Sequence, residues 1–172
     1  MNEQNPMRKP RIIKCVVNIG VGSGGEKQRK ARDVIKMLTG QEPVDTISKT
    51  TNADIGIREG QTIGCKVTLR DEKAYNFLKK AFWVTEDKIL VDNFDENGNF
   101  SFGIDDYTDF EDMKYDPNIG IFGLDISVEL ARKGERIKRR KKEAKKIPEH
   151  QKLTKEEAIE YVEKAFGVEA IE

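Results

Sequence analysis

The stretch Ile57–Arg70, IREGQTIGCKVTLR, decides the fold, because apolar and polar residues alternate in it from position 63 onward. The apolar positions are Ile63, Cys65, Val67 and Leu69. The polar positions are Gly64, Lys66, Thr68 and Arg70. A period of two predicts a β-strand with one buried and one solvent-facing side. The solvent-facing side is cationic and hydrogen-bonding, and its glycine permits close approach to the backbone, so it suits phosphates and sugars.

The segment 11–19, RIIKCVVNI, predicts a second strand with the same kind of solvent-facing side. Its inward positions would be Ile13, Cys15, Val17 and Ile19, and its outward positions Lys14, Val16 and Asn18. Together the two strands predict a polar surface that carries Lys14, Asn18, Lys66, Thr68 and Arg70. Gly20 and Gly22 after the first strand, and Gln41 further on, would lie at its rim.

The following segments predict alternating helices and strands. Ser23 or a nearby glycine caps a helix with apolar positions Ala31, Val34, Ile35 and Leu38, which ends at Gly40. A short strand over 44–48 and an exposed hairpin-like loop over 49–60 come next. Asp71 then caps a helix that reaches about Trp83 and presents Tyr75, Phe77, Leu78, Ala81 and Phe82.

The C-terminal half predicts further strands and one more helix. Strands over 89–94 and 100–104 flank Asn97-Gly98, a hairpin turn sequence, and another strand covers 121–130. Thr154 and Glu157 form a capping box that opens a final helix, which Gly167 closes. The expected fold is α+β, a mainly antiparallel sheet with helices packed on one face. The sequence predicts a flexible N-terminal arm (1–10), an α+β domain that carries the polar surface (11–131) and a basic extension with a terminal helix (132–172).

Charge is distributed in blocks, although the formal net charge is zero. Residues 1–70 carry thirteen Lys and Arg against seven Asp and Glu, and residues 132–146 carry ten against two. Residues 86–116 carry two cations against eleven carboxylates. A partner responds to the local field, so segregation of this size favours contacts with several surfaces over a role in solubility alone.

Composition excludes other classes. The apolar runs are too short to span a bilayer, and no signal peptide is expected. Cys15 and Cys65 fall on apolar strand positions, which predicts buried thiols and fits a reducing cytoplasm. We expect no metal and no cofactor.

Four patterns resemble small-molecule sites. Gly20, Gly22 and Gly25 have the dinucleotide-binding spacing, but Lys14 and Asn18 leave one side of the preceding strand polar, unlike a central parallel strand. Asp95, Asn97 and Asn99 imitate a calcium loop, yet Phe100 stands where glycine is needed. The carboxylates from Asp105 to Asp112 match no defined site, and nothing places a nucleophile near His150, the only histidine. A nucleotide-cofactor enzyme remains an alternative, as does a protein-interaction module.

The RNA-binding interpretation has several supporting features. Arg and Lys neutralise phosphates, Asn, Gln and Thr bond sugar hydroxyls or base edges, and the shallow RNA minor groove accepts a flat sheet. The block Arg132–Lys146 adds to these, in particular Arg136, Lys138, Arg139, Arg140, Lys141 and Lys142. The competing interpretation, ordinary solvated positions of a one-sided sheet, explains the strand pattern alone equally well.

Several ordered motifs resemble one family, the 5S-rRNA-binding ribosomal protein five of the large subunit. They are PRIIKCVVNIGVG, LTGQEPV, IREGQTIGCKVTLR, FDENGNFSFGI, Tyr115–Pro117 and IGIFGLDISV, over about residues 8–130. The basic block and terminal helix are similar to the archaeal and eukaryotic branch. The resemblance implies a non-catalytic protein of the central protuberance, located in the cytoplasm.

The resemblance also implies partners and residue roles. Asn18, Gln41 and Thr68 match RNA-recognising positions of the family, and the loop over 49–60 would reach the P-site tRNA with Lys49, Thr50, Thr51, Asn52, Ile55 and Arg58. Only Lys49 and Arg58 are cationic in this loop, which is fewer cations than the family usually has. Further partners would be 5S rRNA, large-subunit rRNA and neighbouring ribosomal proteins, including one of the small-subunit head.

Overall fold

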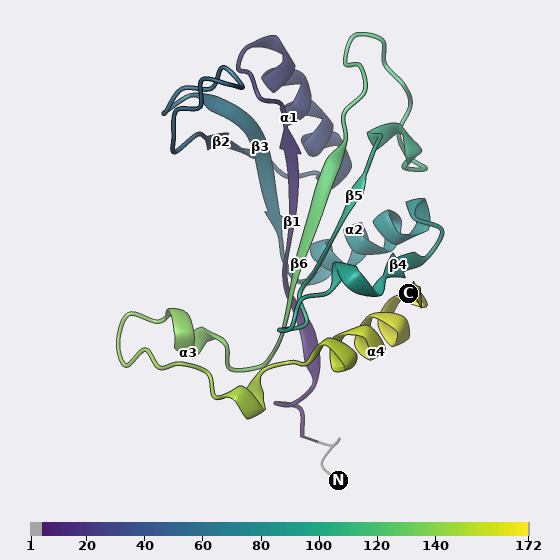
Figure 1. Cartoon of the computed structure of the whole chain (residues 1–172). Helices are drawn as coiled ribbons and strands as arrows, with labels where there is room; N and C mark the ends of the chain where they lie inside the picture. Colours follow the sequence, from purple (N-terminus) through teal and green to yellow (C-terminus); the bar gives the residue numbers. More distant parts are fainter. Residues whose placement is uncertain (1–4, 172) are drawn as a thin grey trace.

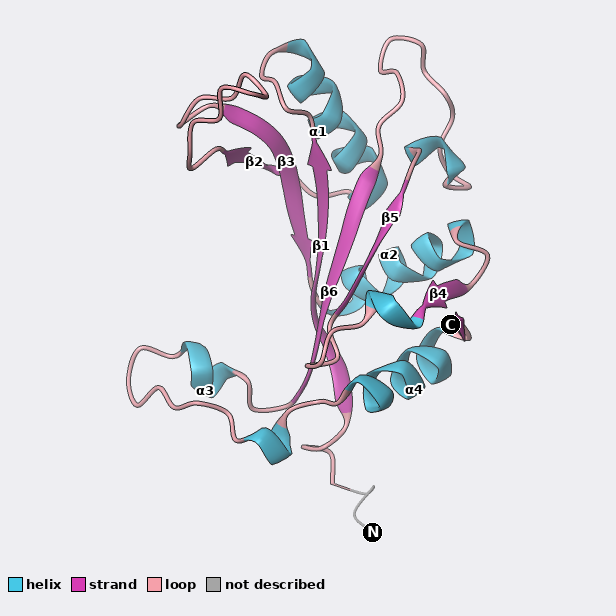
Figure 2. Cartoon of the chain, viewed as in Figure 1, coloured by secondary structure: helices cyan, strands magenta, loops and turns pink. Residues whose placement is uncertain are grey.

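A twisted antiparallel sheet runs through the centre of the molecule, with its strands in the order β2-β3-β1-β6-β5 (Figures 1 and 2). The computed structural model describes residues 5–171. The strands of this sheet are β1 (Pro10–Gly20), β2 (Val44–Ile47), β3 (Thr62–Leu69), β5 (Phe100–Ile104) and β6 (Leu124–Arg132). A small second sheet pairs β4 (Lys88–Leu90) with β7 (Glu169–Ile171). The helices are α1 (Glu26–Thr39), α2 (Asp71–Val84), α3 (Arg136–Arg139) and α4 (Lys155–Phe166).

Alternation along the strands divides the central sheet into an apolar and a polar face. The apolar side chains of β1, β3 and β6 are buried, namely Cys15, Val17, Ile19, Cys65, Val67, Leu69, Leu124, Ile126, Val128 and Leu130. Helix α1 covers them with Ala31, Val34 and Ile35, and α2 with Ala74, Phe77, Leu78, Ala81 and Phe82. Full burial of one large aliphatic side chain stabilises a fold by roughly 1.5–3 kcal/mol, so this layer holds the molecule together. The predicted α+β class, with helices on one face, is confirmed.

The two cysteines are buried free thiols, as predicted. Burial raises the pKa of the Cys15 thiol to about 12. It also raises the pKa of Cys65 to about 11, with a smaller contribution from Asp45. Neither thiol therefore ionises at neutral pH.

The alternation predicted for β1 breaks near its start. The register with β6 shifts between Ile12 and Lys14, where a bulge inserts one extra residue. Ile12, opposite Leu130, packs against the core instead of Ile13, which was expected to point inward. Beyond the bulge, Cys15, Val17 and Ile19 face inward as predicted.

The predicted strand over 89–94 forms only in part. Lys88–Leu90 is a strand, which pairs in parallel with β7, while Val91–Asn93 form a 3-10 turn. The predicted turn at Asn97-Gly98 does form, but the segment before it pairs with β5 at one position only, through a bridge between Phe94 and Phe100. The physical reason is that β4 pairs with β7 near the C-terminus instead of with β5, and local sequence does not reveal this distant partner.

Two element boundaries also differ from the prediction. Arg70, rather than Asp71, occupies the N-cap of α2, and Asp71 turns the chain with φ of 51° and no capping hydrogen bond. Because β3 passes into α2 without a loop, one residue must reverse the chain direction, and aspartate tolerates this left-handed conformation. Strand β6 begins at Leu124 rather than at position 121, because its pairing with β5 starts opposite Ile104.

The C-terminal helix α4 packs into the same core as the sheet. Thr154 and Glu157 form the predicted capping box, and Gly167 ends the helix in a left-handed conformation. Leu153, Ala158 and Val162 are buried in the common core. Arg132 at the end of β6 also bonds both carboxylate oxygens of Glu157, at 2.5 and 2.7 Å. The terminal helix is thereby fixed against the sheet.

The N-terminal arm predicted over 1–10 lies partly outside the described residues, at 1–4. Its described part is an exposed turn, in which the Met7 amide donates to Asn5 Oδ1 at 2.9 Å. None of the helices within residues 5–171 is long and apolar enough to cross a membrane.

Candidate nucleic-acid interface

The polar face of the sheet, which we call the open face, brings four predicted site residues together. Antiparallel pairing sets Asn18 of β1 beside Lys66 of β3, and Val16 beside Thr68. Lys14 lies on the same side of β1, two residues before Val16. The helices α1 and α2 cover the opposite face, so these side chains face away from the core.

The β3 side of the open face carries cations without acidic partners. Lys66 and Arg70 are both exposed, and neither forms an ion pair with any residue in the described range 5–171. Thr68, half-buried, lies between them on the same side of the strand. Within the described part of the chain, a polyanion would have no ion pair to break before it binds these two charges.

The β6 side of the open face is acidic, which the sequence interpretation missed. Lys14 Nζ lies 2.8 Å from Glu129, and Asn18 Nδ2 donates to Asp125 Oδ2 at 3.4 Å. Burial alone would raise the pKa of Glu129, but hydrogen bonds with Lys14, Glu135 and Arg139 outweigh it and lower that pKa to about 2. Strand alternation did place Asp125 and Glu129 outward, but only the β1–β6 pairing sets them beside Asn18 and Lys14.

Gln41 connects the end of α1 to the open face. Gly40 stops α1 in a left-handed conformation, and the next residue turns back toward β3. There, Gln41 Nε2 donates to the carbonyl oxygen of Thr68 at 3.2 Å. The structure thus brings Gln41 and Thr68 into direct contact, although 27 positions separate them in the sequence.

The glycine turn after β1 is bonded to the protein itself. The amides of Val21 and Gly22 both donate to the carbonyl oxygen of Ile63, at 2.9 and 2.8 Å. These amides are therefore not directed at a phosphate. The dinucleotide interpretation is wrong, because β1 lies between antiparallel neighbours instead of in the parallel sheet that such a site requires. A Cβ at Gly20 or Gly22 would meet no atom within 4 Å, so space beside the turn remains open.

Gly64 on β3 also has an internal role. A Cβ at this position would lie 2.5 Å from the Ile19 carbonyl oxygen and 3.0 Å from Thr46 Oγ1. Behind it, Gln28 Nε2 donates to the Gly64 carbonyl oxygen at 2.6 Å and to Asp45 at 3.0 Å. The close approach expected at this glycine is made by neighbouring strands and α1.

The loop over 49–60 forms the predicted hairpin and projects past the ends of β2 and β3 (Figure 1). Asn52 and Ile57 exchange backbone hydrogen bonds at 2.8 and 2.9 Å, and Ile55 at the tip is 66% exposed. Thr51 Oγ1 accepts from the Glu59 amide at 3.0 Å. The predicted loop residues are all exposed: Lys49, Thr50, Thr51, Asn52, Ile55 and Arg58.

The basic extension divides into paired and unpaired cations. Arg139 bonds both oxygens of Glu129, at 2.7 and 2.9 Å, while Lys138 and Arg140 lie near carboxylates at 3.6 and 3.7 Å. Within residues 5–171, no ion pair engages the other three predicted cations, Arg136, Lys141 and Lys142. They are exposed on α3 and the loop that follows it.

The remaining candidate sites have structural explanations. One oxygen of Asp95 accepts from the Asn97 and Asn99 amides, at 2.9 and 2.7 Å, so this carboxylate holds the turn that resembled a calcium loop. His150 lies in an exposed 3-10 turn. Residues 5–171 contain no group of three or more His, Cys, Asp and Glu that could hold a metal ion.

Comparison with known proteins identifies the family. Residues 5–58 match the family described as ribosomal protein L5, and residues 62–161 match the model of that ribosomal family's C-terminus. The large ribosomal subunit protein uL5 of Methanosphaera stadtmanae is 49% identical over 95% of this chain and 98% of its own length. The uL5 proteins of Methanoregula boonei and Picrophilus torridus are each 48% identical, over 95% and 98% of this chain and 99% and 96% of their own lengths. With its antiparallel sheet, polar open face and near full-length similarity to archaeal relatives, the chain belongs to the uL5 family of large ribosomal subunit proteins.

Proposed function

We propose that this protein is a structural component of the large ribosomal subunit that binds 5S rRNA with the β2–β3–β1 part of its open face. One observation carries the proposal: Lys66 on β3 and Arg70 directly after it are exposed on either side of Thr68, without carboxylate partners among the described residues. Its relatives are ribosomal proteins, so the prediction that the chain is not an enzyme agrees with its family.

The open face suggests a division of roles. Lys66 and Arg70 neutralise phosphates, whereas Asn18, Gln41 and Thr68 bond sugars or base edges and fix the register of the RNA. Lys14 contributes less than its charge suggests, because Glu129 already holds its ammonium group at 2.8 Å. The RNA therefore lies toward β3 and away from the acidic β6 side.

The test is the affinity of the Asn18→Ala/Thr68→Val double variant for 5S rRNA, measured by filter binding at fixed salt. Loss of two polar contacts should weaken binding by about 2 kcal/mol, roughly thirtyfold, with an unchanged circular dichroism spectrum and melting temperature. The matched control is Asn76→Ala on the exposed side of α2, which should bind as the parent protein does. Unchanged affinity of the double variant would exclude these residues from the interface.

The loop over 49–60 is proposed to contact the P-site tRNA. Its exposed tip with Ile55, and its position beyond the sheet, suit a contact made away from the 5S rRNA surface. Replacing residues 50–58 with a Gly-Ser linker should leave 5S rRNA affinity intact and reduce retention of P-site tRNA by reconstituted ribosomes. Equal tRNA retention by both proteins would refute this contact.

The charged blocks are proposed to face other ribosomal partners. Arg136, Lys141 and Lys142 suit large-subunit rRNA, because they are exposed cations outside the ion pairs of the extension. The acidic segment 86–116 suits a basic neighbouring protein, such as one of the small-subunit head. Site-specific cross-linking from Lys142 and from Asp112 in assembled ribosomes would distinguish RNA from protein neighbours.

A further inference from the structure

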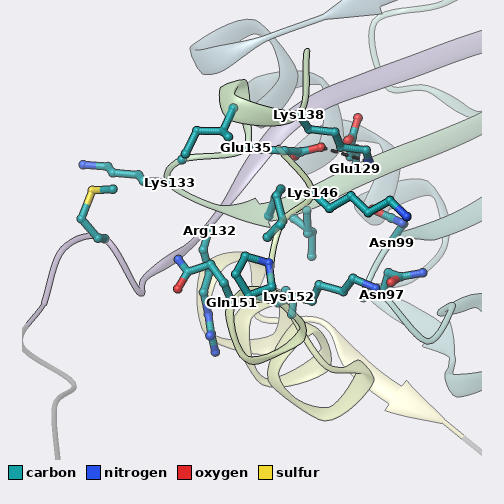
Figure 3. Close-up of a pocket in the computed structure, with 18 residues that line it drawn as sticks. Asn97, Asn99, Glu129, Arg132, Lys133, Glu135, Lys138, Lys146, Gln151 and Lys152 are labelled. Carbon is teal, nitrogen blue, oxygen red and sulfur yellow. Dashed lines mark ion pairs between the residues drawn. The ribbon is translucent and has the colours of Figure 1, made fainter. Parts of the chain in front are cut away.

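A pocket of about 560 Å³ lies where the end of β6 meets α3, outside the residues assigned to 5S rRNA (Figure 3). Its walls come from separate parts of the chain: β6, the turn at 97–99, α3 and the segment 146–153. A volume of this size is within the range of small-molecule sites. The α4 capping region and the Arg132–Glu157 bond hold one wall in place.

The lining combines an apolar surface with a cationic rim. The accessible apolar side chains include Ile137, Ile147 and Pro148, whereas Leu130 and Leu153 are almost fully buried. Figure 3 shows Lys146 and Lys152 extending toward the side of the pocket that carries Asn97 and Asn99. Neither lysine forms an ion pair within residues 5–171. Both ammonium groups are therefore available to an anion that enters the pocket.

Two polar atoms of the lining residues are fully buried. One is Oε2 of Glu135, whose side chain is only 9% exposed, and the other is Arg132 Nε. Burial raises the pKa of Glu135, and the hydrogen bond and repulsion from Glu129 raise it further. Because both atoms are buried, the groups that the pocket offers to a ligand are its accessible apolar side chains and the lysine ammonium groups.

The chemistry of the pocket selects between two anionic occupants. An acidic peptide would bring carboxylates toward Glu129 and Glu135, which repel them. A nucleotide has a flat base for the accessible apolar surface and a phosphate for the lysines. Proteins commonly recognise unpaired RNA bases that are unstacked from the rest of the RNA.

We propose that this pocket holds one unstacked nucleotide of RNA, with its base on Ile137, Ile147 and Pro148 and its phosphate on Lys146 and Lys152. The proposal rests on the proposed function as an RNA-binding protein. It adds a second point of contact beside the open face. Glu129 joins the two regions, because its carboxylate bonds Lys14 on the open face and lines the pocket.

The test is a titration of the full-length protein, with labelled Ile and Leu methyl groups, by 5′-GMP, inorganic phosphate and an Asp/Glu hexapeptide. We expect saturable NMR shifts of the Leu130, Ile137, Ile147 and Leu153 methyls with 5′-GMP, and smaller shifts with the other two probes. Lys146→Glu/Lys152→Glu should weaken 5′-GMP binding by about tenfold or more, equivalent to about 1.4 kcal/mol. The control Lys141→Glu/Lys142→Glu makes the same charge change outside the pocket and should leave binding within about twofold.

Three results would overturn the pocket proposal: no methyl shifts with 5′-GMP, equal shifts with phosphate alone, or tighter binding of the hexapeptide. The proposal is also overturned if the two lysine variants lose 5′-GMP affinity equally, because general electrostatics would then explain the binding. Failure here is separable from failure of the proposed function. If only the pocket proposal fails, Asn18→Ala/Thr68→Val still loses affinity for 5S rRNA. If instead the pocket binds 5′-GMP and Asn18→Ala/Thr68→Val keeps its affinity for 5S rRNA, the open-face assignment is refuted.

Discussion

At the scale of single residues, two glycines near the open face have opposite constraints. Gly64 is buried between β1 and β2, where a Cβ would meet the Ile19 carbonyl oxygen at 2.5 Å. Gly20, at the end of β1, has no atom within 4 Å of the corresponding position. The first glycine is required by packing of the protein, while the second leaves space beside the proposed RNA surface.

Gly64→Ala should therefore lower the free energy of unfolding by about 1–3 kcal/mol, because backbone atoms of the neighbouring strand cannot move aside without distorting the ladder. Gly20→Ala is the matched control and should change it by less than about 0.5 kcal/mol. Urea denaturation followed by circular dichroism measures both values. Equal stabilities of the two variants would show that the β1–β3 contact is looser than the structure indicates.

The carboxyl pair Glu129 and Glu135 makes a pH-dependent prediction. The pKa of Glu135 is raised by burial and by Glu129, so the folded state is penalised above that raised pKa and carries no penalty below the unfolded value. Glu135→Gln removes the penalty and should stabilise the protein by about 1 kcal/mol at pH 8. The difference from the parent should shrink as pH falls toward 4, where Glu135 is protonated in both states.

The exposed Glu143→Gln serves as control for this pair and should change stability by less than about 0.5 kcal/mol at either pH. Thermal denaturation at several pH values gives the comparison. A destabilised Glu135→Gln protein at pH 8 would mean that the contacts of Glu135 with Lys138 and Arg139 outweigh the repulsion from Glu129.

At the scale of elements, α4 fixes the C-terminal extension to the domain. Its apolar side places Ala158 and Val162 in the common core, and Tyr75 of α2 stacks on Phe166 with ring centroids 4.8 Å apart. The Tyr75 hydroxyl also donates to the Ala165 carbonyl oxygen at 2.8 Å. The helix thus also supports one wall of the pocket.

Thr154→Ala removes the side-chain oxygen that accepts from the Glu157 amide at the start of α4. Loss of this cap should lower the free energy of unfolding by about 1 kcal/mol. Thr50→Ala, on the exposed loop, should have no measurable effect. If the two variants melt at the same temperature, α4 does not depend on its capping box.

The elements that could be predicted from sequence are those with local causes. Alternation revealed β1, β3 and β6, the glycines at 40 and 167 marked helix ends, and Thr154 with Glu157 marked a helix start. The pairing of β4 with β7 could not be predicted, because each strand has three residues and the two lie far apart in sequence. The bulge near Ile13 was missed for a related reason, since a bulge depends on the partner strand.

The same distinction between local and long-range causes applies to the candidate site. Lys14, Asn18, Lys66 and Thr68 were placed on one face by alternation alone. Their acidic neighbours Asp125 and Glu129 were not foreseen, because only the β1–β6 register brings them there. The contact between Gln41 and Thr68 likewise depends on how α1 packs on β3.

At the scale of the whole molecule, zero net charge conceals a surface divided by sign. The β3 side of the open face is cationic, the β6 side is acidic, and α3 carries further cations, one of which bonds Glu129. A polyanion that approaches this face is directed to β3. Binding to RNA should consequently depend on where a charge lies more than on how many charges the protein has.

The most direct test compares two double variants with the same change in net charge, Lys66→Glu/Arg70→Glu on the open face and Lys73→Glu/Lys79→Glu on α2. Affinity for 5S rRNA is measured across a salt series. The open-face variant should lose affinity more than about tenfold, and its slope of log K against log salt should fall by about 2. The α2 variant should keep both values close to those of the parent protein. Equal losses in the two variants, or a larger loss in the α2 variant, would contradict binding of 5S rRNA by the open face.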